Sequence, residues 1–237
     1  MTTHRLLSKE RFGGNDLWGV TPRPGRPLVD ELQRASGDLA RRGGGLLHWW
    51  VTAPTAEHEQ AAAAAGFDPY RHLHRMERPL PVTNEPYDMS WRPFRPDIDD
   101  AAWLEVNRLS FSSHPIQGTM VQDDLDRAKA DPSFNPEGFV IASEGDHITG
   151  FCWTKIHRDA EPAVGEIYII GAHPDYRGRG LGRALVLAGL DWLHGQGLTI
   201  GMLYVETNNE PAVRLYFRLG FKIVYDFRCW RRKIEAV

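Results

Sequence analysis

Residues 170–183 read Ile-Gly-Ala-His-Pro-Asp-Tyr-Arg-Gly-Arg-Gly-Leu-Gly-Arg. The apolar, β-branched run that leads into this stretch from Ile167 predicts a strand. Apolar residues three and four positions apart after Leu181 predict a helix. The Gly-rich loop between them is typical of a phosphate-binding site, because a helix N-terminus presents free N–H groups and a partial positive charge, and glycine lets an anion approach the backbone.

Three arginines in this loop, Arg177, Arg179 and Arg183, supply charge that pairs with phosphate. Two well-known phosphate loops do not match the stretch. Its glycine spacing differs from the G-x-G-x-x-G fingerprint of dinucleotide-binding folds, and the Gly-Lys-Ser/Thr ending of a Walker A loop is absent. A Gly-rich turn with solvated arginines is the purely structural alternative.

A faint internal repeat surrounds the loop. An order of helix, strand, helix and strand is predicted for Leu181–His194, Ile200–Glu206, Glu210–Leu219 and Lys222–Arg232. The same order is predicted near the N-terminus, for Leu28–Arg42, Leu46–Thr52, Ala56–Ala65 and Tyr70–Arg78. In both copies Gly-Phe follows the second helix, and glycine is the usual residue just past a helix C-terminus.

The second copy is preceded by further elements that the first copy lacks. They are predicted strands at Trp91–Pro93, Phe139–Ser143 and Ile148–His157 and predicted helices at Asp99–Ser110 and Met120–Ala130. We therefore expect a degenerate partial repeat (residues 1–80), a Pro-containing linker (81–89) and a complete domain (90–237). The expected fold class is α/β (α+β), with a mixed central sheet flanked by helices.

The composition of the chain excludes several classes of binding partner. The 237 residues carry a net charge of −3, so no positive field points to nucleic acid or anionic lipid. No apolar run reaches the roughly 18 residues that span a bilayer, and the polar N-terminus lacks the apolar stretch of a signal peptide. Neither Cys152 nor Cys229 has the spacing of a metal site. We expect a cytoplasmic monomer or homodimer without metal, nucleic-acid or membrane partners.

Two motifs carry a family resemblance. The stretch Arg177-Gly178-Arg179-Gly180-Leu181-Gly182 resembles the R/Q-x-x-G-x-G/A signature of the GNAT acetyltransferases. The stretch from Asn209 to Phe221 resembles the second hallmark of that family, N-x-x-A-x-x-x-Y-x-x-x-G-F. The two motifs occur in the family's order, and the fit covers roughly Ser90 to Lys233. The resemblance implies a GNAT fold, acetyl-CoA as cofactor and an amine as acceptor.

Further segments resemble the mycothiol synthase family. They are the tandem repeat itself, residues 107–118, Trp153-Thr154-Lys155 and Gly165-Glu166-Ile167-Tyr168. This resemblance implies that the C-terminal repeat acetylates the cysteinyl amine of Cys-GlcN-Ins. One position departs, because Ile116 stands where the family has an acidic residue that serves the acceptor. The alternatives are therefore a peptide or protein N-terminus, another small amine, or a non-catalytic acyl-CoA-binding module.

The resemblance also assigns roles to single residues. Glu166 would be the general base, and Tyr216 would be the general acid that protonates the sulfur of CoA. The residues expected to bind the cofactor are Ile170, Gly171, Ala172, Arg177, Gly178, Arg179, Gly180, Leu181, Gly182, Arg183, Asn209 and Arg214. The acceptor pocket is expected to include Lys155, Tyr204 and His114. Each residue also has a purely structural alternative. Glu166 could be a surface carboxylate, Tyr216 a core residue and Asn209 a helix cap, and the three pocket residues could be strand or loop residues without a role.

The N-terminal repeat departs from the pattern. Its loop contains Pro22, Pro24 and Pro27, and proline has no N–H to offer a phosphate. Ala62 takes the place of Tyr216 when the two copies are matched. We expect this half neither to catalyse nor to bind CoA well, but to cover the catalytic domain or to form one wall of the acceptor site.

Overall fold

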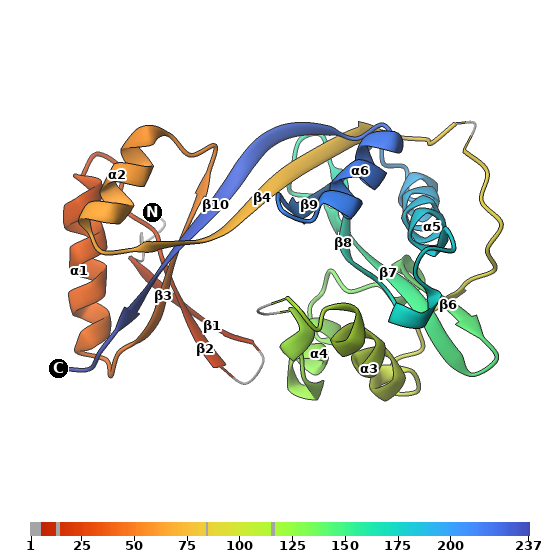
Figure 1. Cartoon of the computed structure of the whole chain (residues 1–237), viewed down its shortest axis with the longest axis horizontal. Helices are drawn as coiled ribbons and strands as arrows, with labels where there is room; N and C mark the ends of the chain where they lie inside the picture. The colour runs from red at the N-terminus through yellow and green to blue at the C-terminus, as the bar shows by residue number, and fades with distance from the viewer. Residues whose placement is uncertain (1–5, 13–14, 84, 115–116) are drawn as a thin grey trace. The chain divides into compact units, whose positions relative to one another are not determined.

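The computed structural model describes residues 6–12, 15–83, 85–114 and 117–237. Its contacts divide the chain into two compact units, which we describe separately. Unit 1 comprises Met1–Arg75, Val205–Asn209 and Ile223–Val237, and unit 2 comprises Met76–Tyr204 and Glu210–Lys222. Figure 1 labels most of the helices and strands of both units.

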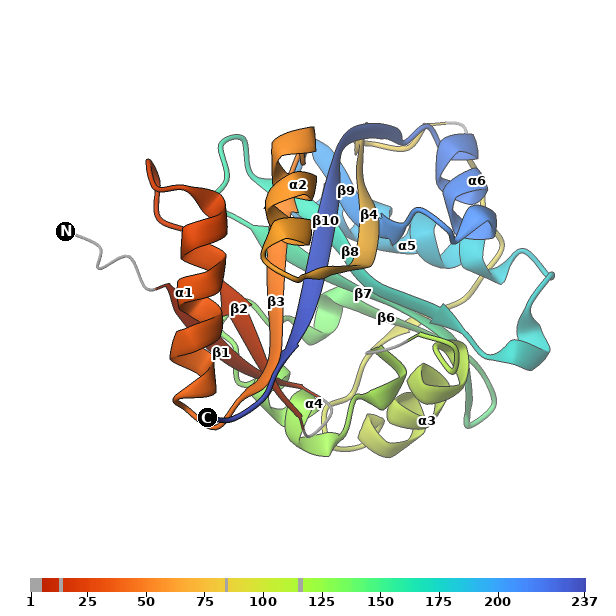
Figure 2. The ribbon, with the colours of Figure 1, turned by 60° about the vertical axis from the view of Figure 1, so that its left-hand side comes forward.

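Unit 1 is an open sheet covered by two helices. Its elements are β1 (Leu7–Phe12), β2 (Asn15–Val20), α1 (Leu28–Ala40), β3 (Gly45–Thr52), α2 (Ala56–Ala64), β4 (Asp68–Pro79) and β10 (Lys222–Ile234). The strand order is β1-β2-β3-β10-β4. β2 and β3 run parallel, whereas β1 with β2 and β3 with β10 run antiparallel. Figure 2 shows α1 and α2 on the same side of β3 and β10.

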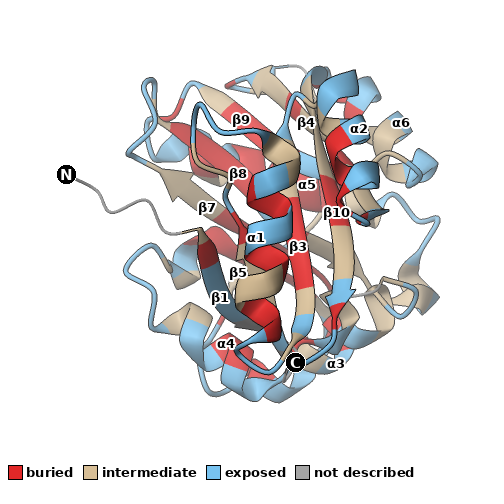
Figure 3. Cartoon of the chain, turned by 90° about the vertical axis from the view of Figure 1, so that its left-hand side faces the viewer, coloured by how far each residue is buried: buried red, intermediate tan, exposed pale blue. Residues whose placement is uncertain are grey.

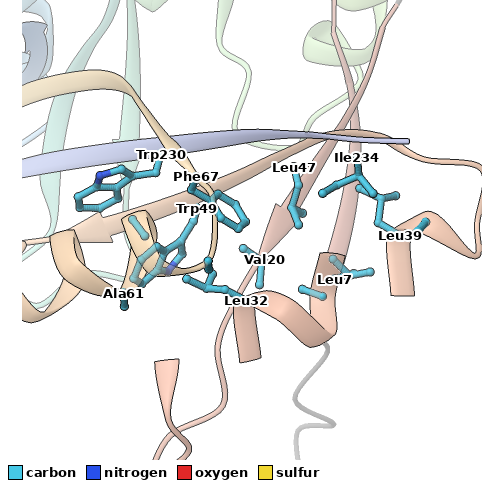
Figure 4. Packing of buried hydrophobic residues seen from close by; sticks show 14 residues of the cluster. Leu7, Val20, Leu32, Leu39, Leu47, Trp49, Ala61, Phe67, Trp230 and Ile234 are labelled. Carbon is cyan, nitrogen blue, oxygen red and sulfur yellow. The ribbon is translucent and has the colours of Figure 1, made fainter. Parts of the chain in front are cut away.

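The core of unit 1 lies between these helices and strands. α1 buries Leu32, Ala35 and Leu39 on one stripe, because residues three and four apart share a helix face. Figure 3 shows this stripe as alternating buried and exposed colour along α1. The facing strands contribute Leu47 and Trp49 from β3 and Trp230 and Ile234 from β10, as Figure 4 shows.

The expected helices and strands of the N-terminal repeat are present, but the sequence analysis did not predict β1 and β2. The physical reason is that this hairpin has little apolar patterning. Leu7 in β1 and Val20 in β2 are buried, while Ser8, Lys9 and Glu10 between them are exposed. Alternation of apolar and polar residues, the usual signal of a half-buried strand, is therefore almost missing.

Unit 2 is a mixed sheet with helices on both faces. Its elements are β5 (Arg92–Pro93), α3 (Asp100–Ser110), α4 (Gln122–Lys129), β6 (Phe139–Glu144), β7 (His147–His157), β8 (Val164–Ala172), α5 (Leu181–Gly195), β9 (Ile200–Glu206) and α6 (Glu210–Arg218). The strand order is β9-β8-β7-β6-β5. β8 and β9 run parallel and the remaining pairs antiparallel. The expected mixed sheet flanked by helices is confirmed.

Neighbouring residues of β7 point to opposite layers. A Cβ on Gly189 of α5 would lie 2.7 Å from the sulfur of Cys152. The ring of the next residue, Trp153, lies 5.8 Å from the ring of Trp103 in α3. Because side chains alternate along a strand, α5 covers one face of the sheet and α3 the other, an arrangement also visible in Figure 1.

No helix in the part of the chain that the structure describes has the length and apolar character needed to cross a membrane. In the same residues, no three His, Cys, Asp or Glu side chains are grouped so as to hold a metal ion.

Candidate active site

β8 and β9 separate partway along their length. The parallel ladder between them consists of three pairs, from Gly165 with Gly201 to Ile167 with Leu203. β8 nevertheless continues to Ala172. A bulge in the β7–β8 ladder lies at this point, since Trp153 pairs with Ile169 but Thr154 pairs with Ile167. A bulge bends a strand and re-aims its side chains, so β8 diverges from β9 just after Ile167.

The separation leaves part of the β8 backbone without a strand partner. The N–H of His173 donates to the carbonyl of Thr149 at 2.8 Å, which fixes the alternation along β8. The amides of Ile169 and Gly171 therefore face β7, while those of Ile170 and Ala172 face the side where β9 no longer pairs. The carbonyl of Ala172 agrees with this, because it accepts a hydrogen bond from Ser110 Oγ at 3.0 Å.

Gly171, one of the residues expected to contact the cofactor through backbone groups, lies where three elements approach closely. Its amide faces β7, and a Cβ at this position would lie 2.9 Å from the ring of Phe151 and 3.0 Å from Cβ of Ser110. Glycine therefore lets α3 and β7 approach β8 closely at the end of the strand.

The loop from β8 to α5 has the backbone that the glycines predict. Gly178 and Gly180 have φ angles of 77° and 81°, and Gly180 is the N-cap of α5. Only glycine adopts such angles at little cost. Gly180 also has no side chain to cap the helix, so the first N–H groups of α5 remain available to an anion. Residues 177–180 are exposed.

The three arginines of the loop have different surroundings. Arg177 donates to the carbonyl of Ser110 at 3.0 Å, and the guanidinium of Arg179 lies 5.1 Å from the ring centroid of Tyr176. Arg183 is held by the linker, since it donates to the carboxylate of Glu85 and to the carbonyl of Pro86. The sequence analysis missed Glu85, because nothing in a linker's composition places it beside a helix N-terminus 98 positions later.

Two pockets flank the N-terminus of α5. One has a volume of about 480 Å³ and is lined by Arg179, Gly180, Leu181 and Arg183 together with residues 86–90. The other, also about 480 Å³, lies between Gly180, Gly182 and Arg183 and the α6 residues Leu215 and Arg218, with Leu219 just beyond α6. The N-terminus of α5, where the sequence predicts a phosphate site, therefore borders two pockets.

Glu166 lies on β8 at the closed end of the strand separation. It is buried, and its Oε2 lies 2.7 Å from Nε2 of His157 on β7. The hydrogen bond with Glu166 raises the pKa of His157 above its usual value, although partial burial opposes the rise. His157 was not among the site residues expected from the sequence. The signal that would have found it is the pairing register of β7 with β8, which a single sequence does not reveal.

Lys155 is the direct cross-strand neighbour of Glu166. Its Nζ lies 3.4 Å from the ring centroid of Tyr168, and that ring contacts Trp153. Trp153, Lys155 and His157 are alternate residues of β7 and share the face covered by α3. The face beside Glu166 therefore combines a cation, an imidazole and an exposed aromatic ring.

Tyr216 lies on α6 and is 6% exposed. Its ring packs against Phe221 at 5.7 Å. Burial raises the pKa of Tyr216 far above its usual value, so the hydroxyl stays protonated at neutral pH. Burial likewise raises the pKa of the Cys152 thiol, which argues against a cysteine nucleophile.

The other expected residues have local contacts. The N–H of Asn209, which precedes α6, donates to the carbonyl of Glu206, and Arg214 pairs with Glu210 at 2.9 Å. His114 accepts a hydrogen bond from the N–H of Gln117 at 2.8 Å. Tyr204 is 37% exposed at the diverging part of β9. Ile116 lies outside the described residues.

Comparison with known proteins gives the following likenesses. The profile of the acetyltransferase (GNAT) family matches residues 101–221. The mycothiol acetyltransferase of Streptomyces coelicolor is 43% identical over 83% of this chain and 62% of its own length. That of Thermobispora bispora is 42% identical over 83% of this chain and 68% of its own length. The chain thus spans about two thirds or less of the length of these relatives.

Two solved structures share the fold. A GCN5-related N-acetyltransferase from Sphaerobacter thermophilus has a TM-score of 0.72 at 21% identity, over 98% of this chain and 77% of its own. A tandem GNAT protein from the clavulanic acid biosynthesis pathway has a TM-score of 0.66 at 15% identity, over 93% of this chain and 76% of its own.

Proposed function

The chain belongs to the acetyltransferase (GNAT) family, and we propose that it transfers the acetyl group of acetyl-CoA to the primary amine of a small molecule. The observation that carries this proposal is the strand separation at Ile167. The same unit, unit 2, supplies two backbone amides that face the side that β9 leaves, a Gly-capped helix N-terminus, a buried carboxylate and a buried tyrosine.

We expect two parts of the backbone of unit 2 to bind acetyl-CoA. The amides of Ile170 and Ala172 would pair with the pantetheine arm as a missing strand would, because they face the side that β9 leaves. The N–H groups from Arg177 to Arg183 would hold the pyrophosphate at the N-terminus of α5. Arg183 would exchange its contact with Glu85 for a phosphate, since both are anions that bind a guanidinium.

Glu166 and Tyr216 would supply the proton transfers. Glu166 would take a proton from the acceptor's ammonium group, directly or through a water molecule. The neutral nitrogen then attacks the thioester carbonyl, a C–N bond forms and the C–S bond breaks. The nitrogen loses its second proton in the same step, which balances the proton that the thiolate gains. Tyr216 would donate its hydroxyl proton to the departing thiolate. General acid–base catalysis of this kind contributes roughly 10²- to 10⁴-fold to a rate.

The relatives favour one acceptor. Both curated relatives cited above are called mycothiol acetyltransferases, which supports the cysteinyl amine of Cys-GlcN-Ins. Lys155 and Tyr168, beside Glu166, offer a cation and an aromatic ring of the sort that a polar acceptor contacts. Ile116, which departs from the mycothiol synthase pattern, keeps a peptide N-terminus or another small amine as the alternative acceptor. The remaining alternative is a module that only binds acyl-CoA. Such a module would need neither a buried general base nor a buried general acid.

Steady-state kinetics with acetyl-CoA and a panel of amines that includes Cys-GlcN-Ins tests the proposal. We expect Glu166→Gln to lower kcat by roughly 10²- to 10⁴-fold and Tyr216→Phe to lower it by roughly 10²-fold. Glu137→Gln, a change of the same kind at an exposed carboxylate, should leave kcat unchanged.

Two outcomes would contradict the assignment. If Glu166→Gln and Tyr216→Phe both match the unchanged protein on a true acceptor, these residues are not the base and the acid. If acetyl-CoA binds but no amine on the panel is acetylated, the chain is a binding module for acyl-CoA.

A further inference from the structure

His157 and Glu166 lie on adjacent antiparallel strands. Val164 is the direct cross-strand neighbour of His157, so Glu166 is its diagonal neighbour on the same face of the sheet. Nε2 of the imidazole lies 2.7 Å from Oε2 of the carboxylate. This distance is that of a charge-assisted hydrogen bond.

The two side chains differ in their access to water. The side chain of Glu166 is 9% exposed, whereas that of His157 is 37% exposed. A buried carboxylate needs a hydrogen-bond donor to remain ionised. His157 supplies that donor and also contacts solvent, so it can gain or lose a proton without any movement of the strands.

From this geometry, and resting on the function proposed above, we infer that His157 is the positioning residue for Glu166 and that its protonation sets the lower pH limit of activity. In the active form His157 is neutral, and its Nε2–H donates to Oε2 of Glu166. The second oxygen, Oε1, is then oriented to accept a proton from the acceptor's ammonium group.

Protonation of the second imidazole nitrogen, Nδ1, converts the hydrogen bond into an ion pair. The added positive charge makes Glu166 a weaker base. The charged groups that act on His157 are Glu166 and Asp159, which favour the imidazolium, and Lys155, which opposes it. Because the pKa of His157 is raised, we expect activity to fall as the pH drops through a value above the roughly 6.5 of a free histidine.

Substitution of His157 separates positioning from titration. His157→Gln keeps an N–H donor but cannot titrate, and His157→Ala removes both properties. We expect His157→Gln to retain most of kcat at pH 8 and to move the acid limb of the kcat profile down by roughly one pH unit or more. We expect His157→Ala to lose roughly 10- to 100-fold in kcat, because a misplaced base is a poor one. His147→Gln, at the exposed start of the same strand, should leave the profile unchanged.

A second readout needs no acceptor. Titration of His157 by NMR should show a raised pKa in the wild-type protein and a lower pKa in Glu166→Gln, because the hydrogen bond with the carboxylate is the main cause of the rise. If that pKa does not respond to Glu166→Gln, or if the acid limb stays in place in His157→Gln, the inference is wrong while the proposed function stands. If the pKa of His157 responds to Glu166→Gln but no amine is acetylated, the proposed function fails instead.

Discussion

At the scale of single residues, the structure buries several charges and gives each of them partners. Asp99 precedes α3, and its side chain is 4% exposed. It accepts hydrogen bonds from Arg92 at 2.5 Å and from Arg95 at 2.8 Å. Burial alone would raise the pKa of Asp99, but these guanidinium groups outweigh it and lower the pKa to about 2.

Asp99→Asn should therefore destabilise the protein in a pH-dependent way. The carboxylate is buried, but Arg92 and Arg95 are 30% and 54% exposed, so we expect the free energy of unfolding at pH 7 to fall by roughly 1–3 kcal/mol. Because the folded pKa lies below the unfolded value, the stabilisation is present above the unfolded pKa and disappears as the pH falls toward about 2. Urea unfolding at several pH values between 3 and 7 measures the difference. A gap that does not narrow with falling pH, or an equal loss in the exposed control Asp68→Asn, would contradict this explanation.

The role of a residue could be predicted from the sequence when it depended on positions close by in the chain. The loop of α5 was recognisable because its arginines and glycines are contiguous and the backbone angles follow from them. His157 and Glu85 were not, since each acts on a residue of another element. Which side chains meet across β7 and β8 depends on a register with a bulge between Trp153 and Thr154, and a one-residue change of register would reverse the faces.

At the scale of elements, the central feature is the close packing of α5 on β7 and β8. A Cβ added at Gly189 would lie 2.7 Å from Sγ of Cys152 and 2.8 Å from Cδ1 of Ile167. The helix therefore lies as near the sheet as glycine permits. This packing fixes the position of the α5 N-terminus, where the phosphate groups of acetyl-CoA would bind.

Two Gly-to-Ala changes in α5 should have opposite effects on stability. Gly189→Ala forces the helix away from β7 and β8, and we expect it to lower the free energy of unfolding by roughly 1–3 kcal/mol. Gly195→Ala adds a Cβ with no atom within 4 Å, and we expect it to be neutral or stabilising by up to roughly 1 kcal/mol. Chemical denaturation of both variants checks this. Equal stability of the two would show that α5 is not packed as described.

Most elements were predictable because their patterns are strong. Helices α1 and α5 show apolar residues three and four positions apart, and β9 is a short apolar run; their observed bounds lie within two residues of the expected ones. β1 and β2 were missed because their pattern is weak. The separation of β8 from β9 also escaped prediction, since it depends on a bulge and not on composition.

At the scale of the whole molecule, the compact units of the structure and the repeats of the sequence have different boundaries. The expected boundaries, 1–80, 81–89 and 90–237, describe two repeats in sequence order. Each compact unit is built from more than one stretch of the chain, and β10 pairs antiparallel with β3 from Phe227–Thr52 to Ile234–Gly45. Trp230 and Ile234 thereby complete the core of unit 1. A local sequence pattern does not reveal that the C-terminal strand pairs with a strand near the N-terminus.

In unit 1, the loop that corresponds to the α5 loop places an ion pair at the start of α1. Arg23 lies in its Pro-containing loop and donates through side chain and backbone to the carboxylate of Glu31, in the first turn of α1. The hydrogen bond from Arg23 lowers the pKa of Glu31 to about 2. A helix N-terminus that already has an ionised carboxylate repels a phosphate, so acetyl-CoA should bind to unit 2 and not to unit 1.

Hydrogen exchange of backbone amides, with and without saturating acetyl-CoA, tests this central claim most directly. We expect slower exchange at Ile170, at Ala172 and across residues 178–183, where bound acetyl-CoA would take up N–H groups without a strand partner. Residues 23–31 of unit 1 should exchange at the same rate in both states. Unchanged exchange at Ile170, Ala172 and 178–183 under saturating acetyl-CoA, or protection confined to unit 1, would contradict the account.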